Sequence, residues 1–570
     1  MLATLGANSV HAGDGLEVFA ADYSIDPGDD IQLYVSLPNN APANAIYQIE
    51  AFTQDYSGYT SVGQDGQKPP NSTLTGQHVD ESLFTPTTDL TGALGWPTAT
   101  LHTLQTDTRK SGVYQVKVLM GLNNDDPAKV ETFSTVILNK AAGTNNDILL
   151  IDTLLNSVGN SAYGGKSLFA YNSSNGEPAA EVAIHRPIGR MGRLQETAAW
   201  LDKNGYQYDV MSEEDLDTTA IPDSYKVVIL TGRNQFFTLG MRQHLDDYVN
   251  NGGHLMILGA ETMRFVASIQ NGKLQAKTGD NADLWQGQAN KENSSTGLTF
   301  SKGGFVNQAI DGGQAILPAT DGNNGGYIVN NGQHWVYYGL GVNTGDVFGK
   351  SDNLINGVGA TANIVGPSVD GMLVTKNGNT VIPNDPDAPL DYQIIAWAPA
   401  EAAGHQTGFY ATPGIFRKGA GWVFNAATMN WSKGLAHLDS EYAEKDAVTA
   451  GITKNVLAAF RNGMTDLDQD NFPKGVDPDD NDPNIPGTGS TGGSGSSGSG
   501  GSGSGGSGGS GSGGAGSGGS GSGGSTGSGS GSSGGSGTSG SGGGGGSTAP
   551  ALLLGLATLG ALRRRVFPRG

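Results

Sequence analysis

The chain has 570 residues, including 92 glycines and no cysteine, and its formal net charge at pH 7 is −22. Such an acidic surface repels nucleic acid and anionic lipid, which argues against nucleic acid as a partner. The missing cysteine excludes thiol nucleophiles, thiolate metal sites and disulfides, and it fits an exported bacterial protein. About 450 residues precede a long Gly/Ser tract, which is enough for two or three domains with cores of their own.

Residues 1–12 are interpreted as the remnant of a signal peptide. Val10-His11-Ala12 stands before Gly13 and has the small-x-Ala pattern of a cleavage site. The apolar stretch before it is too short for a complete signal peptide, so its true start lies upstream or was trimmed. The alternative is a disordered terminus.

Residues 13–140 have the signals of an all-β domain. Turn clusters such as Asp26-Pro27-Gly28-Asp29 separate short apolar or alternating runs, and no helical period is present. The runs are Ile31–Val35, Tyr47–Phe52, Val113–Leu119 and Phe133–Leu138. An immunoglobulin-like sandwich is the expected architecture.

From Asp147 the pattern changes to strands that alternate with helices, which predicts βαβ units and a parallel, doubly wound sheet. Strands are predicted at Asp147–Ile151, Tyr206–Val210, Val227–Leu230 and His254–Leu258, and helices at Arg193–Lys203 and Thr238–Asn250. The second helix is expected to bury Leu239, Met241, Leu245, Tyr248 and Val249. Residues 270–404 are interpreted as a β-rich elaboration. A strand at Trp422–Asn425 and a helix near Glu441–Arg461 complete the α/β domain, 147–463.

Several segments of this domain, in the same order, resemble blocks of the large (beta) subunit of N,N-dimethylformamidase and its relatives. Val227–Thr238 (VVILTGRNQFFT) is similar to a strand-plus-loop block of the form VVLxGHxEYWS. The other similar segments are Asn160–Phe169, Ala183–Ile188, Tyr248–Ala260, His334–Phe348 and Gly419–Leu435. The resemblance implies a glutamine-amidotransferase-like α/β fold.

The resemblance also implies a mononuclear iron, held by two tyrosines and a glutamate, that activates water to hydrolyse an amide. At the aligned positions this chain has Gly159 and Ile188 for the tyrosines and Gln235 for the glutamate. Gly and Ile cannot bind iron, and a neutral amide is a poor substitute for a carboxylate. The sequence therefore argues against iron, unless an insertion lets Tyr163 or Tyr171 supply a phenolate.

A polar site remains possible, because ligands of doubly wound sheets bind at the carboxyl ends of the strands. Candidate catalytic residues are Arg233, Gln235 and Glu261, with Glu261 as the acid that could act as a base. Candidate binding residues for a carboxylate or a sugar are Asn160, Arg186, Asn234 and Arg264. The alternative is that Arg233 and Glu261 form an ordinary salt bridge.

An Asp-rich segment at 466–486 is predicted to bind calcium as a stiff stalk under the domain. Its alternating carboxylates suit a hard cation with six to eight oxygen ligands. The candidate ligands are Asp466, Asp468, Asp470, Asp477, Asp479 and Asp482. The spacing resembles the thrombospondin type 3 calcium repeat, and the alternative is a solvated acidic linker.

The last part of the chain is expected to be a tether and a sorting tail. Residues 487–548 form a flexible Gly/Ser linker, and 549–570 contain the apolar segment Ala549–Leu562 followed by Arg563-Arg564-Arg565. This order resembles the GlyGly-type carboxyl-terminal sorting tails of Gram-negative bacteria, which rhombosortase proteases process. The implied partner is a sorting protease, and the implied location is the cell surface or medium after transient membrane anchorage. An ordinary tail anchor is the alternative.

These features together predict an exported, surface-anchored binding module on a degenerate hydrolase fold, with an unidentified small-molecule or glycan ligand. The alternative is an extracellular hydrolase that acts on amide or related C–N bonds with a rebuilt site. A structural surface-layer component is a third hypothesis.

Overall fold

A computed structural model describes most of residues 146–483 and a set of strands before them. The gaps in 146–483 are 163–164, 174–175, 189–190, 307–308, 311–313, 316–325, 350–363, 403–405 and 437–445. The earlier described segments are 17–20, 22–26, 31–36, 45–55, 58–61, 74–75, 100–104, 112–122 and 131–139. The expected signal remnant, linker and sorting tail lie outside the described residues.

The described residues before Asn146 form strands in two sheets, as the turn-punctuated sequence predicts. One sheet has the order β1-β3-β7 and is antiparallel, and the other has the order β2-β9-β8-β4-β5, with β6 beside β4. The strands are β1 (Glu17–Ala20), β2 (Ser24–Ile25), β3 (Ile31–Ser36), β4 (Ala45–Asp55), β5 (Gly58–Ser61), β6 (Leu74–Thr75), β7 (Thr100–Leu104), β8 (Gly112–Leu122) and β9 (Glu131–Asn139).

The described residues after Asn146 are built on a seven-stranded sheet of order β12-β10-β13-β15-β30-β29-β26. Its first five strands are parallel, which confirms the predicted parallel sheet, and the last two are antiparallel. Every residue of β10 and β13 is buried, because helices cover both faces of a sheet of this type. The strands are β10 (Ile148–Ile151), β12 (Asp209–Met211), β13 (Val227–Gly232), β15 (His254–Gly259), β26 (Gln393–Ile394), β29 (Gly414–Lys418) and β30 (Gly421–Asn425).

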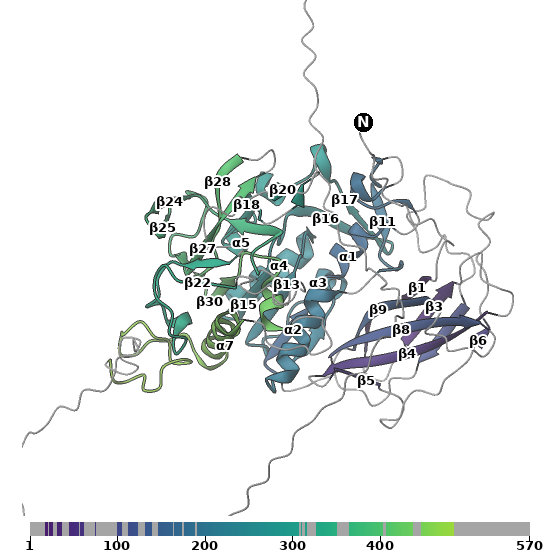
Figure 1. Cartoon of the computed structure of the whole chain (residues 1–570), viewed down its shortest axis with the longest axis horizontal. Coiled ribbons are helices and arrows are strands. Elements are labelled where there is room, and N and C mark those ends of the chain that lie inside the picture. The colour runs from purple at the N-terminus through teal and green to yellow at the C-terminus, as the bar shows by residue number, and fades with distance from the viewer. Residues whose placement is uncertain are drawn as a thin grey trace, which may run out of the picture. The chain divides into compact units, whose positions relative to one another are not determined.

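Helices lie on both faces of this sheet (Figure 1). Helix α6 contacts both α2 and α7 on one face, while α3 and α4 pair on the other. The helices are α1 (Leu154–Asn160), α2 (Gly192–Lys203), α3 (Glu213–Thr218), α4 (Leu239–Asn250), α5 (Asn293–Thr296), α6 (Trp431–Leu435) and α7 (Ala447–Asn462).

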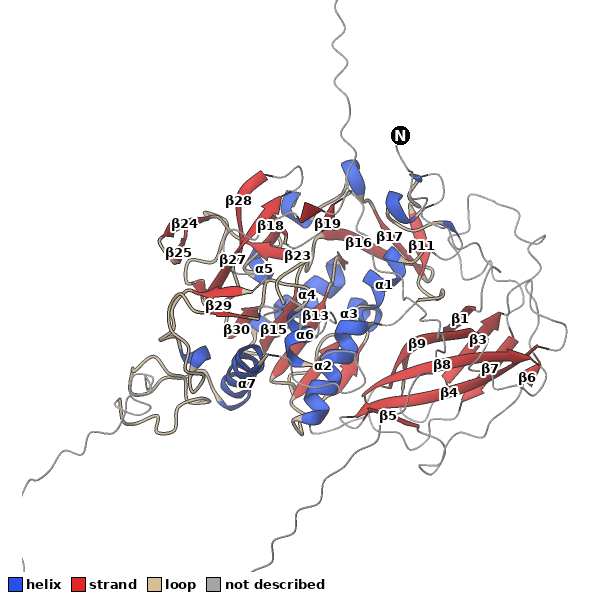
Figure 2. Ribbon diagram, in the orientation of Figure 1, coloured by secondary structure: helices blue, strands red, loops and turns tan. Residues whose placement is uncertain are grey.

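Figure 2 shows many short strands in the long connection between β15 and β29, and most of them form smaller sheets beside the central one. One sheet, of order β11-β17-β16-β14, also includes two strands that precede β15, and another has the order β22-β21-β27-β18-β23 with β28 beside β27. The strands are β11 (Glu181–Ala183), β14 (Phe236–Phe237), β16 (Phe265–Gln270), β17 (Lys273–Ala276), β18 (Thr299–Phe305), β19 (Ala309–Ile310), β20 (Gln314–Ala315), β21 (Tyr327–Val329), β22 (Val347–Phe348), β23 (Ser368–Gly371), β24 (Val374–Asn377), β25 (Thr380–Pro383), β27 (Ala396–Ala402) and β28 (Gln406–Ala411).

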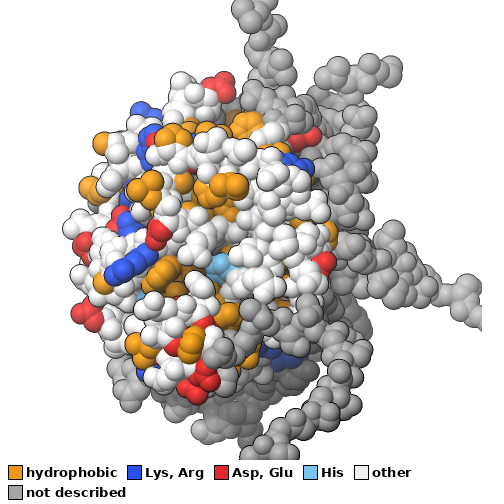
Figure 3. Space-filling model, turned by 90° about the vertical axis from the view of Figure 1, so that its left-hand side faces the viewer, with side chains coloured by type: hydrophobic (Ala, Val, Ile, Leu, Met, Phe, Trp, Pro, Cys, Tyr) orange, Lys and Arg blue, Asp and Glu red, His pale blue; other side chains and the backbone are white. Residues whose placement is uncertain are grey.

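The surface of this part of the chain is chemically mixed on the face that Figure 3 presents. Acidic and basic side chains are interspersed there, and hydrophobic side chains form separate small groups. A mixed surface of this kind does not mark the whole face as a contact region.

Helix α4 both confirms and corrects the sequence prediction. Thr238 caps it, because its hydroxyl accepts a hydrogen bond from the backbone N–H of Met241 at 3.0 Å. Leu239 was predicted to face the core but is 69% exposed. It is the first residue of the helix, where the 3.6-residue period does not yet constrain a side chain against the sheet. The predicted strand Tyr206–Val210 also begins later, as β12.

Two buried carboxyl groups close the end of β10. Asp152 Oδ1 accepts hydrogen bonds from the backbone N–H groups of Leu154 at 3.2 Å and Glu213 at 2.9 Å. Glu213 begins α3, and its Oε2 accepts from the N–H of Leu155 at 2.7 Å. Burial raises the pKa of Asp152 to about 7 and raises the pKa of Glu213 well above its usual value. The sheet edge is therefore held by carboxyl groups that resist ionisation.

The stability of the chain should depend on pH through Asp152. Its pKa is about 7 in the folded state against 3.8 for the free side chain, so the folded state binds its proton more tightly. The resulting stability is complete below pH 3.8 and is lost as the pH rises to about 7. The Asn side chain of Asp152→Asn cannot ionise and keeps the Oδ1 acceptor. As the pH rises, its unfolding free energy should therefore fall by on the order of 3 kcal/mol less than that of the wild type. Urea unfolding between pH 4 and 7.5 measures the difference. The exposed Asp280→Asn is the control, and an identical fall in Asp152→Asn would contradict the assignment.

Candidate functional site

The strand order of the central sheet identifies its ligand-binding edge. When the five parallel strands are numbered in chain order, they lie side by side as 2-1-3-4-5. The chain therefore leaves β10 toward one side of the sheet and leaves β13 toward the other. Sheets of this type bind ligands at the carboxyl ends of the strands, where the order reverses. The residues that follow β13 and β15 at that edge are the predicted candidates Arg233, Asn234, Gln235 and Glu261.

Glu261 is the centre of a buried ion-pair network at this edge. Its side chain is fully buried, and Arg233 Nε lies 3.0 Å from Oε1. Gln235 Nε2 donates a hydrogen bond to Oε2 at 2.6 Å, and Arg264 donates to the same oxygen. The backbone N–H of Glu261 donates to Asp370 Oδ1 at 2.8 Å. The structure thus brings together four predicted residues, Arg233, Gln235, Glu261 and Arg264, and the alternative of an Arg233–Glu261 salt bridge is confirmed.

The backbone and charge of Glu261 both show that it is held in place. Its φ of 56° lies in the left-handed region, which costs energy for a residue other than glycine. Burial favours its neutral form, but attraction by Arg233 and Arg264 and hydrogen bonds from Ser368 and Arg264 outweigh burial and lower its pKa to about 2. A carboxylate with so low a pKa is a weak base near neutral pH.

A second polar chain runs from this network toward the surface. Asn160 Nδ2 donates to Gln235 Oε1 at 3.4 Å, and the Tyr171 hydroxyl donates to Asn160 Oδ1 at 2.7 Å. Burial raises the pKa of Tyr171 to about 12, so this phenol is neutral. Asn160, Tyr171 and Arg264 are only partly buried, which makes them the members of the network that solvent can reach. Tyr163, the other tyrosine considered from sequence, lies outside the described residues.

Two predicted binding residues take structural roles instead. Asn234 is fully buried, and its Nδ2 donates to the Asp152 carbonyl at 2.8 Å and to Glu213 Oε1 at 2.7 Å. Arg186 is 3% exposed and donates to the backbone carbonyl of Lys166 at 3.0 Å. Neither side chain contacts Glu261, because each is directed into a different loop junction.

The positions that the resemblance assigns to iron ligands do not fit an iron site. A Cβ at Gly159 would lie 2.5 Å from the ring of Phe236, so no larger side chain fits there. Ile188 is buried in the hydrophobic core. Gln235 is neutral and its amide is bound to Glu261. None of these groups offers the hard anionic oxygen that ferric iron prefers.

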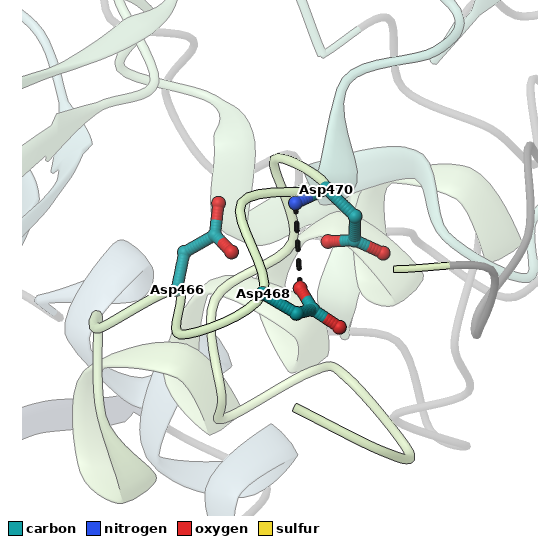
Figure 4. A group of neighbouring side chains, drawn as sticks. All are labelled: Asp466, Asp468 and Asp470. Atoms are coloured by element: carbon teal, nitrogen blue, oxygen red, sulfur yellow. Dashed lines mark hydrogen bonds between the residues drawn. The ribbon is translucent and has the colours of Figure 1, made fainter. Parts of the chain in front are cut away.

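The Asp-rich segment forms the one group of three or more possible metal-ligating side chains within the described residues. One oxygen from each of Asp466, Asp468 and Asp470 lies within 4.8 Å of the others (Figure 4). The N–H of Asp470 donates to Asp468 Oδ1 at 3.3 Å. This turn points carboxylates toward one another, an arrangement that a divalent cation can stabilise.

The second half of the segment adds a residue that the sequence did not indicate as a ligand. Asp480 is 8% exposed, and its Oδ1 accepts from the N–H of Leu467 at 3.0 Å. The N–H of Asp482 donates to the Asp479 carbonyl at 3.0 Å in a backbone turn. The Oδ2 atoms of Asp468, Asp477 and Asp480 are buried without a hydrogen-bond partner among the described residues.

The first part of this segment packs against the α/β domain. Gly475 approaches α7 so closely that a Cβ on it would lie 2.4 Å from Ala459 Cα. The ring of Phe472 meets that of Tyr338 edge-on at 5.6 Å. Met464, Phe472 and Val476 are partly buried against the hydrophobic core, so residues 464–476 fold back onto the α/β domain.

The sequence interpretation missed Asp152, Glu213, Asp370 and Ser368 as members of this edge. Asp152 follows a continuously apolar strand, so its position at a strand end was a readable signal. The other three lie 61 residues or more away in the chain, and no local pattern links them to Asp152 or Arg233.

Comparison with known proteins bears on the origin of this site. None of the curated proteins compared with the chain matches it. A family model described as N,N-dimethylformamidase beta subunit-like, C-terminal, matches residues 48–445. The match covers the Glu261 network and part of the preceding β region, and it ends before the Asp-rich segment. The chain therefore belongs to the N,N-dimethylformamidase beta subunit-like family.

Proposed function

We propose that this chain is an exported, surface-anchored binding module on a hydrolase scaffold that has lost its iron-binding side chains. The observation that carries the proposal is the state of Glu261. Its carboxylate is fully buried and surrounded by two arginines and an amide, so it is shielded from water and from a metal ion. Such a group stabilises the edge and leaves binding to its partly exposed neighbours.

The proposed ligand surface consists of Asn160, Tyr171 and Arg264. The Arg264 guanidinium lies 4.8 Å from the ring centre of Phe265 and 4.1 Å from that of Phe300. Aromatic rings fix the planar cation, and Asn160 and Tyr171 add amide and hydroxyl groups. This combination supports a small polar ligand, such as a carboxylate-bearing molecule or a glycan.

Two finer features of the fold belong to the same proposal. The 2-1-3-4-5 order and the helices on both faces support a glutamine-amidotransferase-like α/β domain. The two mainly antiparallel sheets before Asn146 support an immunoglobulin-like domain.

The alternative function is an extracellular hydrolase for amide or related C–N bonds with a rebuilt site, and family membership favours it. Asp370 has a charge state that suits a general acid. Burial raises its pKa to about 8, and it lies against the backbone of Glu261. An acid protonated near neutral pH can donate a proton.

The two functions differ in what Glu261→Gln does. For the binding module, the purified chain hydrolyses no formamide and holds no stoichiometric iron. The variant loses about 3–5 kcal/mol of unfolding free energy, because Arg233 is left buried without its counter-ion. Formamide turnover, iron analysis and urea unfolding measure these outcomes. Glu177→Gln, whose side chain is 77% exposed, is the matched control. Turnover that Glu261→Gln abolishes without loss of stability would establish the hydrolase.

We also propose that the Asp-rich segment binds calcium as a structural ion. The convergent oxygens of Asp466, Asp468 and Asp470 support this, as do the buried Oδ2 atoms that lack partners. The sequence-predicted ligands Asp477, Asp479 and Asp482 remain part of the proposal.

Calcium should protect the Asp-rich segment from proteolysis. In millimolar calcium, cleavage within residues 466–482 should slow severalfold relative to chelated protein, because the ion offsets repulsion between carboxylates. Asp468→Asn with Asp479→Asn should remove the difference, and Asp280→Asn should keep it. Mass spectrometry of the fragments provides the measurement, and equal cleavage of the wild-type chain in calcium and chelator would leave the solvated-linker interpretation.

Export and surface anchorage are proposed from segments outside the described residues. In the part of the chain that the structure describes, no helix has the length and apolar character needed to cross a membrane. The proposal instead rests on Val10-His11-Ala12 and on Ala549–Leu562 followed by three arginines. A sorting protease that acts on this tail is the proposed partner.

Protein recovered from the cell surface or medium should begin near Gly13 and lack the arginine cluster. Amino-terminal sequencing and intact-mass analysis test both ends. Replacing Arg563, Arg564 and Arg565 with glutamine should reduce the amount released, because the positive residues hold the segment in its cytoplasmic orientation. Cytoplasmic protein that retains Met1 would contradict the proposal.

A further inference from the structure

Two basic residues but only one carboxylate lie where α2 contacts α6. Arg193 Nη1 lies 2.7 Å from Glu196 Oε1 and 2.6 Å from Oε2. The hydroxyl of Ser432 donates to Glu196 Oε2 at 2.8 Å. The Glu196 side chain is 1% exposed, so both of its oxygens are already engaged and shielded from water.

The second basic residue, Lys433, has no such partner. Its ammonium forms no hydrogen bond or ion pair with any residue that the structure describes, yet it lies within the electrostatic influence of Arg193 and Glu196. Burial, together with the charge of Arg193, lowers the pKa of Lys433 to about 8, and the charge of Glu196 opposes this change. A partly buried cation beside another cation is costly unless an anion compensates it.

Arg193 also has unused donors. Within the described residues it hydrogen-bonds only through Nη1, and Nε is buried without a partner. Its side chain as a whole is 21% exposed, so solvent reaches part of it. The Nε–Nη2 edge of a guanidinium can bind two oxygens of one anion, and an ammonium adds a point charge.

The cluster lies at the ligand-binding edge of the sheet. Arg193 packs against Gly232, the last residue of β13, where a Cβ would lie 2.8 Å from Arg193 Cβ. The Thr231 hydroxyl donates to the Arg193 carbonyl at 3.1 Å. The φ of Gly232 is 70°, a conformation that glycine adopts without strain, and this allows the close approach.

We propose that Arg193 and Lys433 bind an oxyanion, namely the carboxylate, phosphate or sulfate group of a ligand. The site is built from α2 and α6 and shares no residue with the Glu261 network. It therefore holds whether the domain is a binding module or a hydrolase. Glu196 neutralises one of the two positive charges of Arg193 and Lys433, and the bound anion compensates the other.

Competitive labelling of the full chain tests the site without any mutation. An amine-acylating reagent is applied at pH 8 with sulfate, phosphate or acetate, each matched in ionic strength with chloride. Sulfate at about twice its Kd should slow acylation of Lys433 about threefold and leave the exposed Lys277 unchanged. Preference for sulfate and phosphate over acetate identifies a tetrahedral anion, and the reverse identifies a carboxylate.

Lys433→Gln provides the second test, with Lys277→Gln as its control. Sulfate should raise the thermal unfolding midpoint of the wild-type chain and the control but not that of Lys433→Gln. In chloride, the midpoint of Lys433→Gln should equal or exceed that of the wild type, because repulsion by Arg193 is removed. Should Lys433→Gln fail to fold, the labelling result decides. Acylation of Lys433 that none of the anions slows, or an equal sulfate response in Lys433→Gln, would overturn the proposal.

Discussion

The ion pairs of Glu261 are the interaction on which the carboxyl edge of the sheet depends. This one carboxylate joins Arg233 after β13 with Arg264 before β16, and its backbone N–H reaches Asp370 in β23. A buried charge is tolerated only when its partners are complete, so these elements must be assembled together. The left-handed backbone of Glu261 is maintained by the same contacts.

Charge is distributed unevenly in this acidic chain. The formal net charge is −22, yet Arg193, Arg233, Arg264 and Lys433 all lie at the ligand-binding edge. Arg233 is neutralised by Glu261, whereas Lys433 lacks a counter-ion among the described residues. Local attraction for an anion can therefore coexist with a strongly negative overall charge, because nearby desolvated charges outweigh distant screened ones.

An aromatic cluster occupies the place where the resemblance expects metal chemistry. Phe236 stacks with Phe265 at 5.4 Å between ring centres and occupies the space beside Gly159. Phe169 also packs against both rings. An aromatic cluster of this kind stabilises the edge by apolar burial, so the fold does not require an ion at this place.

The sequence by itself determined the parallel sheet, its two main helices and the family resemblance, because strand runs, helical periods and the ordered blocks are local patterns. It also placed Arg233, Gln235 and Glu261 at strand ends. Only the tertiary structure decided what those side chains do. Glu261 joins several elements, because Arg264 and Asp370 contact it from other parts of the chain. Asn234 has a structural role, because its side chain donates a hydrogen bond to Glu213. Burial and charge compensation depend on residues distant in the chain, and no local pattern records them.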